Sequence, residues 1–209
     1  MGRRHTGRPL AAVTLVAVLA LAGATPASSA GGRVHDAKYG FTFNLPAHWQ
    51  SVPLSGGDVS GLLNLITKAD PSMKAALSAQ VTQAAKSGFR FFALGPIRNK
   101  FAPNINIIVE PVNGLPTGTS YYNEMGVEVK LNLVSAGLKN VRTGTVALSL
   151  GKVVEATYSL KTKLSASTAF GVQFYLPHKG HLFIVTFTSW SLATARSDSL
   201  TVGNSWGWS

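Results

Sequence analysis

The alternation of apolar and polar residues in the second half of the chain is the feature that most restricts its fold. Residues 104–112 and 153–160 change character at every second position, which is the period of a half-buried β-strand. Residues 170–176 and 182–188 flank the turn Pro177-His178-Lys179-Gly180, and the second of these segments is apolar on both faces. Together with a hairpin predicted between residues 141–148 and 153–160, they indicate an antiparallel sheet with covered central strands.

The first half of the chain adds strands and helices to this sheet. Two strands are predicted at residues 39–44 and 89–94, with a further extended segment at 49–52. Capping residues and apolar spacing predict helices at 59–68 and 71–87, and a short last helix is expected between residues 191 and 202. Residues 119–136 fit either a strand, through Val127, Val129, Leu131 and Leu133, or a helix, through Tyr121, Met125, Val129 and Leu133. Their length and the possible cap Ser120 favour the helix.

The N-terminal thirty residues have the three parts of a secretory signal peptide. Arg3, Arg4 and Arg8 form a positive region, residues 10–24 are apolar, and Ser28-Ser29-Ala30 supplies the small residues that signal peptidase requires. The apolar run has 15 residues, whereas a membrane span needs about 20. The residues around the arginine pair also do not favour a twin-arginine signal. We therefore expect Sec-type export, cleavage of residues 1–30, and one domain at residues 31–209.

Composition restricts the mature chain further. The sequence has no cysteine, so the fold has no disulfide, and there is no lipobox to carry a lipid anchor. Three of the 19 basic residues lie in the leader, which leaves a formal net charge of +8 on the mature chain. These charges are scattered, as in proteins that associate with anionic lipids, cell-wall polymers or acidic partners, whereas nucleic-acid readers concentrate them in a stripe. A surface that is basic only for solubility is the alternative.

Groups that could perform catalysis are few, since the chain has eight acids in all and four histidines after the leader. Residues 203–207 match the G-x-S-x-G pattern of a nucleophile elbow, but only two residues follow, too few for the helix, acid and histidine that such a site needs. His178 and His181 flank a turn, and a metal site there would need His48 or Glu155 as a further ligand. No phosphate loop, Rossmann fingerprint, HExxH or EF-hand pattern is present, so we expect no cofactor and no metal.

Two other groups of residues are candidates for binding. Asn104, Asn106 and Glu110 share one strand face and could bind a cation or a sugar, although a solvated face is the favoured interpretation. Three tryptophans, Trp190, Trp206 and Trp208, lie within the last twenty residues. If exposed together, they would form a partner-binding platform for carbohydrate or a lipid interface, and if buried, as we favour, they would close the core.

Several of these segments resemble PsbP-like domains, including the exported actinobacterial LpqN-type proteins. The resemblance rests on YGFTFNLP at residues 39–46 with Trp49 behind it, NINIIVE at 104–110, GKVVEATY at 151–158 and LFIVTF at 182–187. It implies an α+β fold in which helices flank both faces of an antiparallel sheet, an α/β/α sandwich. It also implies a superfamily that binds partner proteins, among them the small GTPase Ran, without a shared catalytic site. The chain departs from LpqN-type proteins in lacking the anchoring cysteine and in ending with NSWGWS.

The sequence thus predicts a secreted, non-catalytic binding or accessory protein that acts on a protein or an anionic envelope component outside the bacterial membrane. Neither nucleic acid nor a transmembrane span after cleavage is expected. Two alternatives stay open. One is an envelope-acting hydrolase with a site among His48, Glu110, Glu155, His178 and His181, and the other is a carrier of an apolar ligand between sheet and helices.

Overall fold

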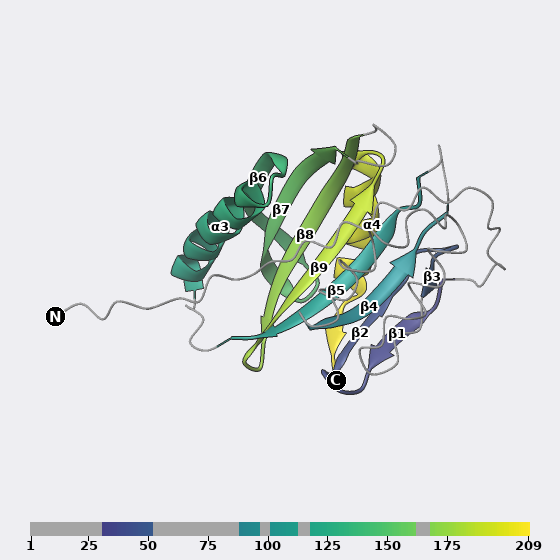
Figure 1. Cartoon of the computed structure of the whole chain (residues 1–209). Coiled ribbons are helices and arrows are strands. Elements are labelled where there is room, and N and C mark those ends of the chain that lie inside the picture. The colour runs from purple at the N-terminus through teal and green to yellow at the C-terminus, as the bar shows by residue number, and fades with distance from the viewer. Residues whose placement is uncertain (1–30, 52–87, 97–100, 113–117, 162–167) are drawn as a thin grey trace.

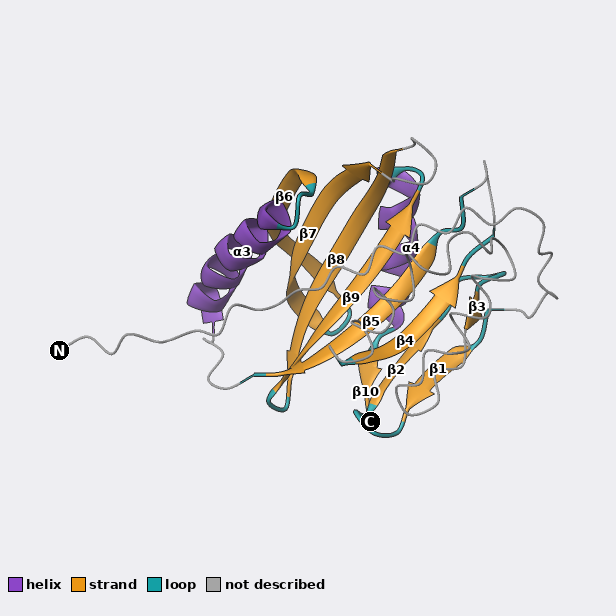
Figure 2. Cartoon of the chain, viewed as in Figure 1, coloured by secondary structure: helices purple, strands orange, loops and turns teal. Residues whose placement is uncertain are grey.

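The computed structural model describes residues 31–51, 88–96, 101–112, 118–161 and 168–209, which form two antiparallel sheets and two helices (Figures 1 and 2). The larger sheet has seven strands in the order β3-β4-β5-β9-β8-β7-β6. Its strands are β3 (Gln50–Ser51), β4 (Phe89–Leu94), β5 (Asn104–Pro111), β6 (Lys139–Leu148), β7 (Gly151–Lys161), β8 (Thr168–His178) and β9 (His181–Ser189). The smaller sheet joins β1 (Arg33–Asp36), β2 (Phe41–Asn44) and β10 (Gly207–Trp208). The helices are α3 (Gly118–Ser135) and α4 (Leu192–Ser205).

These elements confirm the predicted α+β class and the antiparallel sheet. All strands predicted from residue 89 onward are present, with ends that differ by a few residues at most. β9 is a central strand paired with β5 and β8, as its apolar faces indicated. The helices predicted at 59–68 and 71–87 lie outside the described residues.

Alternate residues of the large sheet divide between two hydrophobic clusters. On β9, Leu182 and Ile184 belong to a cluster that contains residues of α3, which we call the α3-side cluster. Phe183, Val185 and Phe187 belong to a cluster that contains residues of α4, the α4-side cluster. Since successive side chains of a strand point to opposite faces, the two clusters lie on opposite faces of the sheet.

Residues 118–135 form a helix, which settles the ambiguous segment. Tyr121, Met125, Val129 and Leu133 recur every four residues and are buried against β6 and β7. Val127 and Leu131, which the strand interpretation placed beside Val129 and Leu133, are instead 62% and 63% exposed. A side chain one turn further along a helix returns to the same face, so the four-residue spacing identified the buried stripe. Neither α3 nor α4 has the length and hydropathy of a membrane-crossing helix.

The second helix, α4, confirms the prediction of a final helix after residue 191. Ser191 has extended backbone angles, with φ −140° and ψ 149°, and its side-chain oxygen accepts a hydrogen bond from the Thr194 amide. This is the usual arrangement at a helix N-cap, where the first amides have no partner within the helix. Ala195 and Val202 on its inner face are buried in the α4-side cluster.

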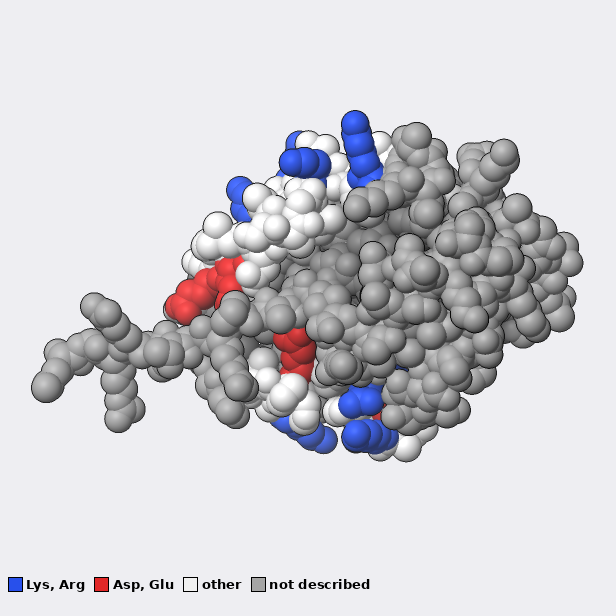
Figure 3. All heavy atoms as spheres, viewed as in Figure 1, with Lys and Arg blue, Asp and Glu red and all other residues white. Residues whose placement is uncertain are grey.

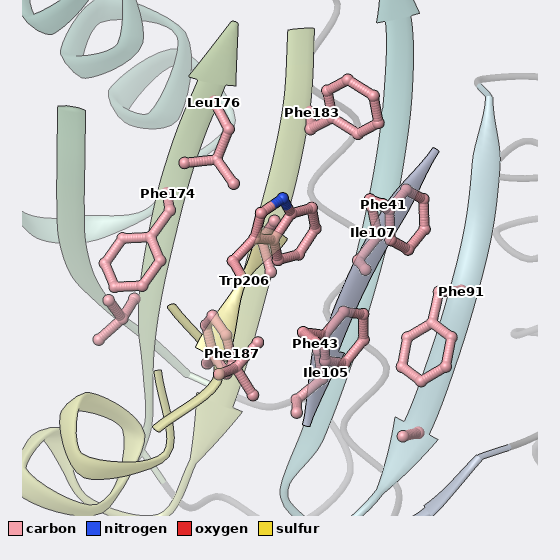
Figure 4. Packing of buried hydrophobic residues seen from close by; sticks show 14 of the residues in the cluster. Phe41, Phe43, Phe91, Ile105, Ile107, Phe174, Leu176, Phe183, Phe187 and Trp206 are labelled. Carbon is pink, nitrogen blue, oxygen red and sulfur yellow. The ribbon is translucent and has the colours of Figure 1, made fainter. Parts of the chain in front are cut away.

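Trp206 connects the two sheets. Its indole stacks on Phe41 and Phe43 of β2, with 5.2 Å between ring centroids in each case, and meets Phe183 of β9 edge-on at 6.5 Å. Figure 4 shows Trp206 among these rings and the side chains of Phe174 and Phe187. The side chain is 5% exposed. The smaller sheet is therefore held against the larger one by aromatic packing.

Two strands of the smaller sheet were not predicted. No strand was predicted before residue 39, yet β1 pairs along four residues with β2. β10 has only two residues, Gly207 and Trp208, which pair with Thr42 and Phe41. Neither segment has enough residues for an alternating pattern, so their strand conformation depends on β2 as a template.

Replacing Trp206 with alanine tests this connection. We expect Trp206→Ala to lower the free energy of unfolding by about 3–5 kcal/mol, because it removes a large buried ring and leaves a cavity. Urea unfolding followed by circular dichroism measures the change. The control is Leu131→Ala on the exposed face of α3, where we expect a change within about 0.5 kcal/mol. Similar losses in both variants would contradict the packing role of Trp206.

Candidate functional site

The three candidate tryptophans do not share one surface. Trp206 is buried in the α4-side cluster, and Trp208 is half-buried at its edge. Trp190 is half-buried against a separate small cluster that contains Phe101 and Ala169. A platform of all three rings is therefore not formed. Trp208, however, belongs to another group of half-buried rings.

This group, which we call the aromatic tip, consists of Tyr39, His178, His181 and Trp208. The imidazole of His178 and the indole of Trp208 are stacked, with centroids 3.9 Å apart and planes within 2° of parallel. Tyr39 meets His181 edge-on at 5.4 Å. All four side chains are half-buried, so each ring has one part packed and another facing solvent.

Two turns bring these rings together. The β8–β9 hairpin places His178 opposite His181, with Lys179 and Gly180 in the left-handed region at φ 44° and 75°. Two such residues in succession are typical of the tightest hairpin turns. In the turn between β1 and β2, Asp36 Oδ1 accepts a hydrogen bond from the Tyr39 amide, and Gly40 has φ 65°. The aspartate-to-glycine spacing in this turn is a sequence signal that could have identified the position of Tyr39, which was predicted as a strand residue.

Positive charges border the aromatic tip. Lys38 Nζ and Arg90 Cζ each lie 5.1 Å from the centroid of the Tyr39 ring, and Lys179 is exposed in the hairpin turn. Figure 3 shows Lys and Arg side chains at the lower rim of the molecule, toward which the hairpin and the C-terminus point in Figure 1. Burial lowers the pKa of His178, and the charges of Lys179 and His181 lower it further. This lowered pKa favours the uncharged form of the imidazole that stacks on Trp208, and the bordering lysine and arginine side chains carry positive charge.

The residues considered for catalysis lie apart. His48 is exposed in the turn before β3, and its φ of 67° lies in the left-handed region that such turns use. Glu110 lies on the α3-side face of β5, and burial raises its pKa. His178 and His181 belong to the aromatic tip at the opposite face. Within the described residues, no three His, Asp or Glu side chains come together as possible metal ligands.

Glu155 is occupied by an ion pair. Its Oε2 accepts a hydrogen bond of 2.8 Å from Arg196 of α4, and its side chain is only 9% exposed, whereas that of Arg196 is 53% exposed. A buried carboxylate needs such a partner to offset the loss of hydration. This contact explains how an acid is accommodated in the α4-side layer.

Ser205 of the G-x-S-x-G pattern is the last residue of α4, not the apex of a strand-to-helix turn. Its Oγ accepts a hydrogen bond from the Asn44 amide and donates one to the Val202 carbonyl. The serine therefore links the helix end to β2, which agrees with the rejection of this motif on context.

The favoured interpretation of Asn104 and Asn106 as part of a solvated strand face is wrong. Both side chains are 0% exposed, and Glu110 on the same face is half-buried. Their polarity suggested solvent because sequence alternation separates two faces but does not show what covers each one.

The Glu155–Arg196 pair gives a testable result. We expect Arg196→Met to lower the free energy of unfolding by about 1–3 kcal/mol, because a buried carboxylate loses its charged hydrogen-bond donor. The double variant Arg196→Met with Glu155→Gln should recover part of this loss, since it removes the unpaired charge. Urea unfolding at neutral pH measures both. Equal stability of the parent and Arg196→Met would show that the pair contributes nothing.

Asp198 of α4 gives a pH-dependent result, because burial raises its pKa from 3.8 to about 6. Its contribution to stability is complete while the side chain is protonated in both states, and is lost as pH rises through about 6. We expect Asp198→Asn to be more stabilising, relative to the parent, at about pH 8 than at about pH 4. Urea unfolding at the two pH values measures this difference, and a pH-independent difference would rule out a titrating Asp198.

No protein-family model matches the chain, and no curated protein matches it in sequence. Similar solved structures include a protein from Bacteroides thetaiotaomicron VPI-5482, with TM-score 0.50 and 10% identity over 87% of this chain and 49% of that one. This chain therefore spans about half the length of the Bacteroides protein.

Two further structures belong to the groups that the sequence resemblance named. Cyanobacterial PsbP (CyanoP) from Synechocystis sp. PCC 6803 has TM-score 0.47 and 16% identity, over 90% of this chain and 99% of that one. LpqN, which is involved in cell envelope biogenesis of Mycobacterium tuberculosis, has TM-score 0.47 and 12% identity, over 84% and 88%. The structural neighbours of this chain thus include PsbP-like proteins, and at these identities the likeness is one of fold.

Proposed function

We propose that this chain is a secreted, non-catalytic binding or accessory protein that uses the aromatic tip to hold a protein or an anionic envelope component outside the bacterial membrane. The observation that carries the proposal is the stack of His178 on Trp208 beside Tyr39, with lysine and arginine at the border. Half-buried aromatic rings surrounded by positive charge are a common composition of binding surfaces.

Three features of the chain support this role. The leader-like segment at residues 1–30 directs the domain at 31–209 to the outside of the cell. The positive net charge favours partners with acidic groups. In the helix-flanked α/β/α arrangement that we propose for the domain, α3 and α4 support opposite faces of the sheet. The hairpin end, where the aromatic tip lies, can then contact a partner without disturbing either layer.

The hydrolase alternative has less support. Its five candidate side chains lie on different faces and turns, and Glu155 is paired with Arg196. A general acid and base must both reach one substrate, at hydrogen-bond distance from the reacting atoms. Binding without turnover is therefore the better explanation of the described residues.

The test compares two variants of the full chain, exported by a bacterial host and purified as the secreted product. The tip variant carries Tyr39→Ala and Trp208→Ala. The control variant carries Tyr122→Ala, which removes a tyrosine that also lies near a lysine, with Lys152 Nζ 5.2 Å from its ring, but outside the tip. Immobilised parent and variants are exposed to envelope extract at low salt, and bound material is eluted with salt.

We expect the parent and the Tyr122→Ala control to retain the same amount of envelope material. The tip variant should retain at least about tenfold less. Retention should fall with salt because the bordering charges are exposed. Circular dichroism of each variant confirms that the fold is kept. Equal retention by the tip variant would rule out the aromatic tip as the binding surface.

A further inference from the structure

The strand β6 forms one edge of the large sheet (Figure 2). Among the described residues it pairs only with β7, and it has ten residues, whereas the strand at the opposite edge, β3, has two. An edge strand presents a row of backbone amides and carbonyls that no neighbouring strand satisfies, so proteins usually keep such strands short or interrupt them. β6 is therefore the longest open edge of the described sheets.

The usual protection of an edge is confined to the first part of β6. A register shift between Lys139 and Arg142 and the positive φ of Asn140, 53°, interrupt the strand there, and both charged residues of β6 lie in this part. Residues 143–148 pair with β7 without interruption and contain neither a charge nor a proline. Since charges, prolines and bulges are what normally prevent a second strand from pairing, this half of β6 is open to an added strand.

Gly144 lies within this open half, and the fold of the chain does not require a glycine there. Its φ is outside the left-handed region, and a Cβ added to it would have no heavy atom of the described chain within 4 Å, apart from its neighbours in sequence. Glycine weakens a strand, and inside one it often marks a place where another backbone or a ligand approaches closely. The open space beside Gly144 therefore indicates that a molecule from outside the chain approaches this edge.

The charged side chains around Gly144 are mainly positive. Arg142 is two positions before Gly144 and therefore lies on the same face of β6. Arg142 and Lys139 are both exposed, and β6 contains no acid. Glu155, which lies opposite Gly144 on β7, is already paired with Arg196. This end of the sheet therefore has an excess of positive charge.

This charge distinguishes between two kinds of added strand. Opposite charges on adjacent strands stabilise the pairing of the strands, whereas like charges destabilise it. A second copy of β6 would bring a further lysine and arginine to the shared edge and no acid. A segment of another protein that carries acidic side chains would neutralise Arg142 and Lys139, and it is the favoured occupant.

We propose that β6 binds an extended acidic segment of a partner protein, which adds a strand to the large sheet and places its carboxylates beside Arg142 and Lys139. Backbone hydrogen bonds along residues 143–148 supply affinity, and the acidic side chains supply specificity. This surface is separate from the aromatic tip, which is built from the β8–β9 hairpin, the β1–β2 turn and β10. The proposal goes beyond the proposed function, and either can fail without the other.

The test uses the secreted full-chain product and three synthetic peptides of the same length as β6. The acidic probe alternates threonine and glutamate, the basic probe alternates threonine and lysine, and the proline probe alternates proline and glutamate. Nuclear magnetic resonance follows the amide shifts and the amide hydrogen exchange of the protein during each titration. We expect the acidic probe to give saturable shifts in β6 and to slow exchange there, because outer-edge amides become hydrogen-bonded.

The other two probes separate strand pairing from simple charge attraction. The basic probe should bind at least about tenfold more weakly than the acidic probe, because it brings like charges to Arg142 and Lys139. The proline probe keeps the negative charge but lacks half of the backbone donors and has a restricted φ. It should also bind at least about tenfold more weakly.

Two variants locate the site. Arg142→Glu should weaken binding of the acidic probe at least about tenfold, because it reverses the charge beside the added strand. Gly144→Val should weaken it by a similar factor, because the new side chain occupies the space beside the glycine. The control Lys38→Glu makes the same charge change at the aromatic tip and should leave binding of the acidic probe unchanged.

A measurement without probe separates lost binding from lost folding. We expect Gly144→Val to be at least as stable as the parent in urea unfolding, because valine suits a strand better than glycine and its Cβ has room. The proposal is overturned if the acidic probe gives no saturable shifts in β6, if the proline probe binds as tightly as the acidic probe, or if either variant binds like the parent. Sedimentation of the parent tests the other occupant, since a dimer that Gly144→Val dissociates would assign the edge to a second copy and overturn the proposal as well.

Discussion

The packing of Trp206 against Phe41 and Phe43 is the interaction on which the rest of this structure depends. It joins the small sheet to the large one, with both ring pairs at 5.2 Å. Because Gly207 and Trp208 follow directly, burial of the Trp206 indole brings β10 beside β2 and Trp208 over His178. The aromatic tip therefore exists only when the core beneath it is packed. Dispersion and the burial of apolar surface hold β10 and Trp208 in place. The chain has no cysteine, so no disulfide contributes.

The central strand β9 separates two different environments. Its odd-numbered residues from Phe183 to Phe187 pack with aromatic side chains and α4, whereas Leu182 and Ile184 belong to the α3-side cluster and the buried Thr186 and Thr188 share their face. Since a strand alternates its side chains strictly, one short segment can serve both layers, and a shift of one residue in pairing would exchange them. Bonding to β5 and β8 along most of its length holds that register.

Local patterns were sufficient for most of the fold. The length of residues 119–136 correctly favoured a helix over a strand, although Ser120 lies inside α3 and is not its cap. The four-residue spacing of Tyr121, Met125, Val129 and Leu133 then gave the buried face of that helix. The turn around Lys179 and Gly180 predicted the β8–β9 hairpin. In contrast, β1 and β10 were missed, and Asn104 and Asn106 were assigned to solvent although they are fully buried. These errors concern which segments pack against each other, and the periodicity of a sequence carries no information about that.

The sequence by itself determined the antiparallel class, the positions of the strands of the large sheet from residue 89 onward and of both described helices, and the absence of disulfides, because each depends on neighbouring residues or on composition. Only the tertiary structure decided which of the three C-terminal tryptophans is buried, which histidine stacks on Trp208, and which cation pairs with Glu155. These pairings join residues thirty or more positions apart, such as His178 and Trp208 or Glu155 and Arg196. Their geometry depends on strand order and packing across the whole domain, and no local pattern encodes it.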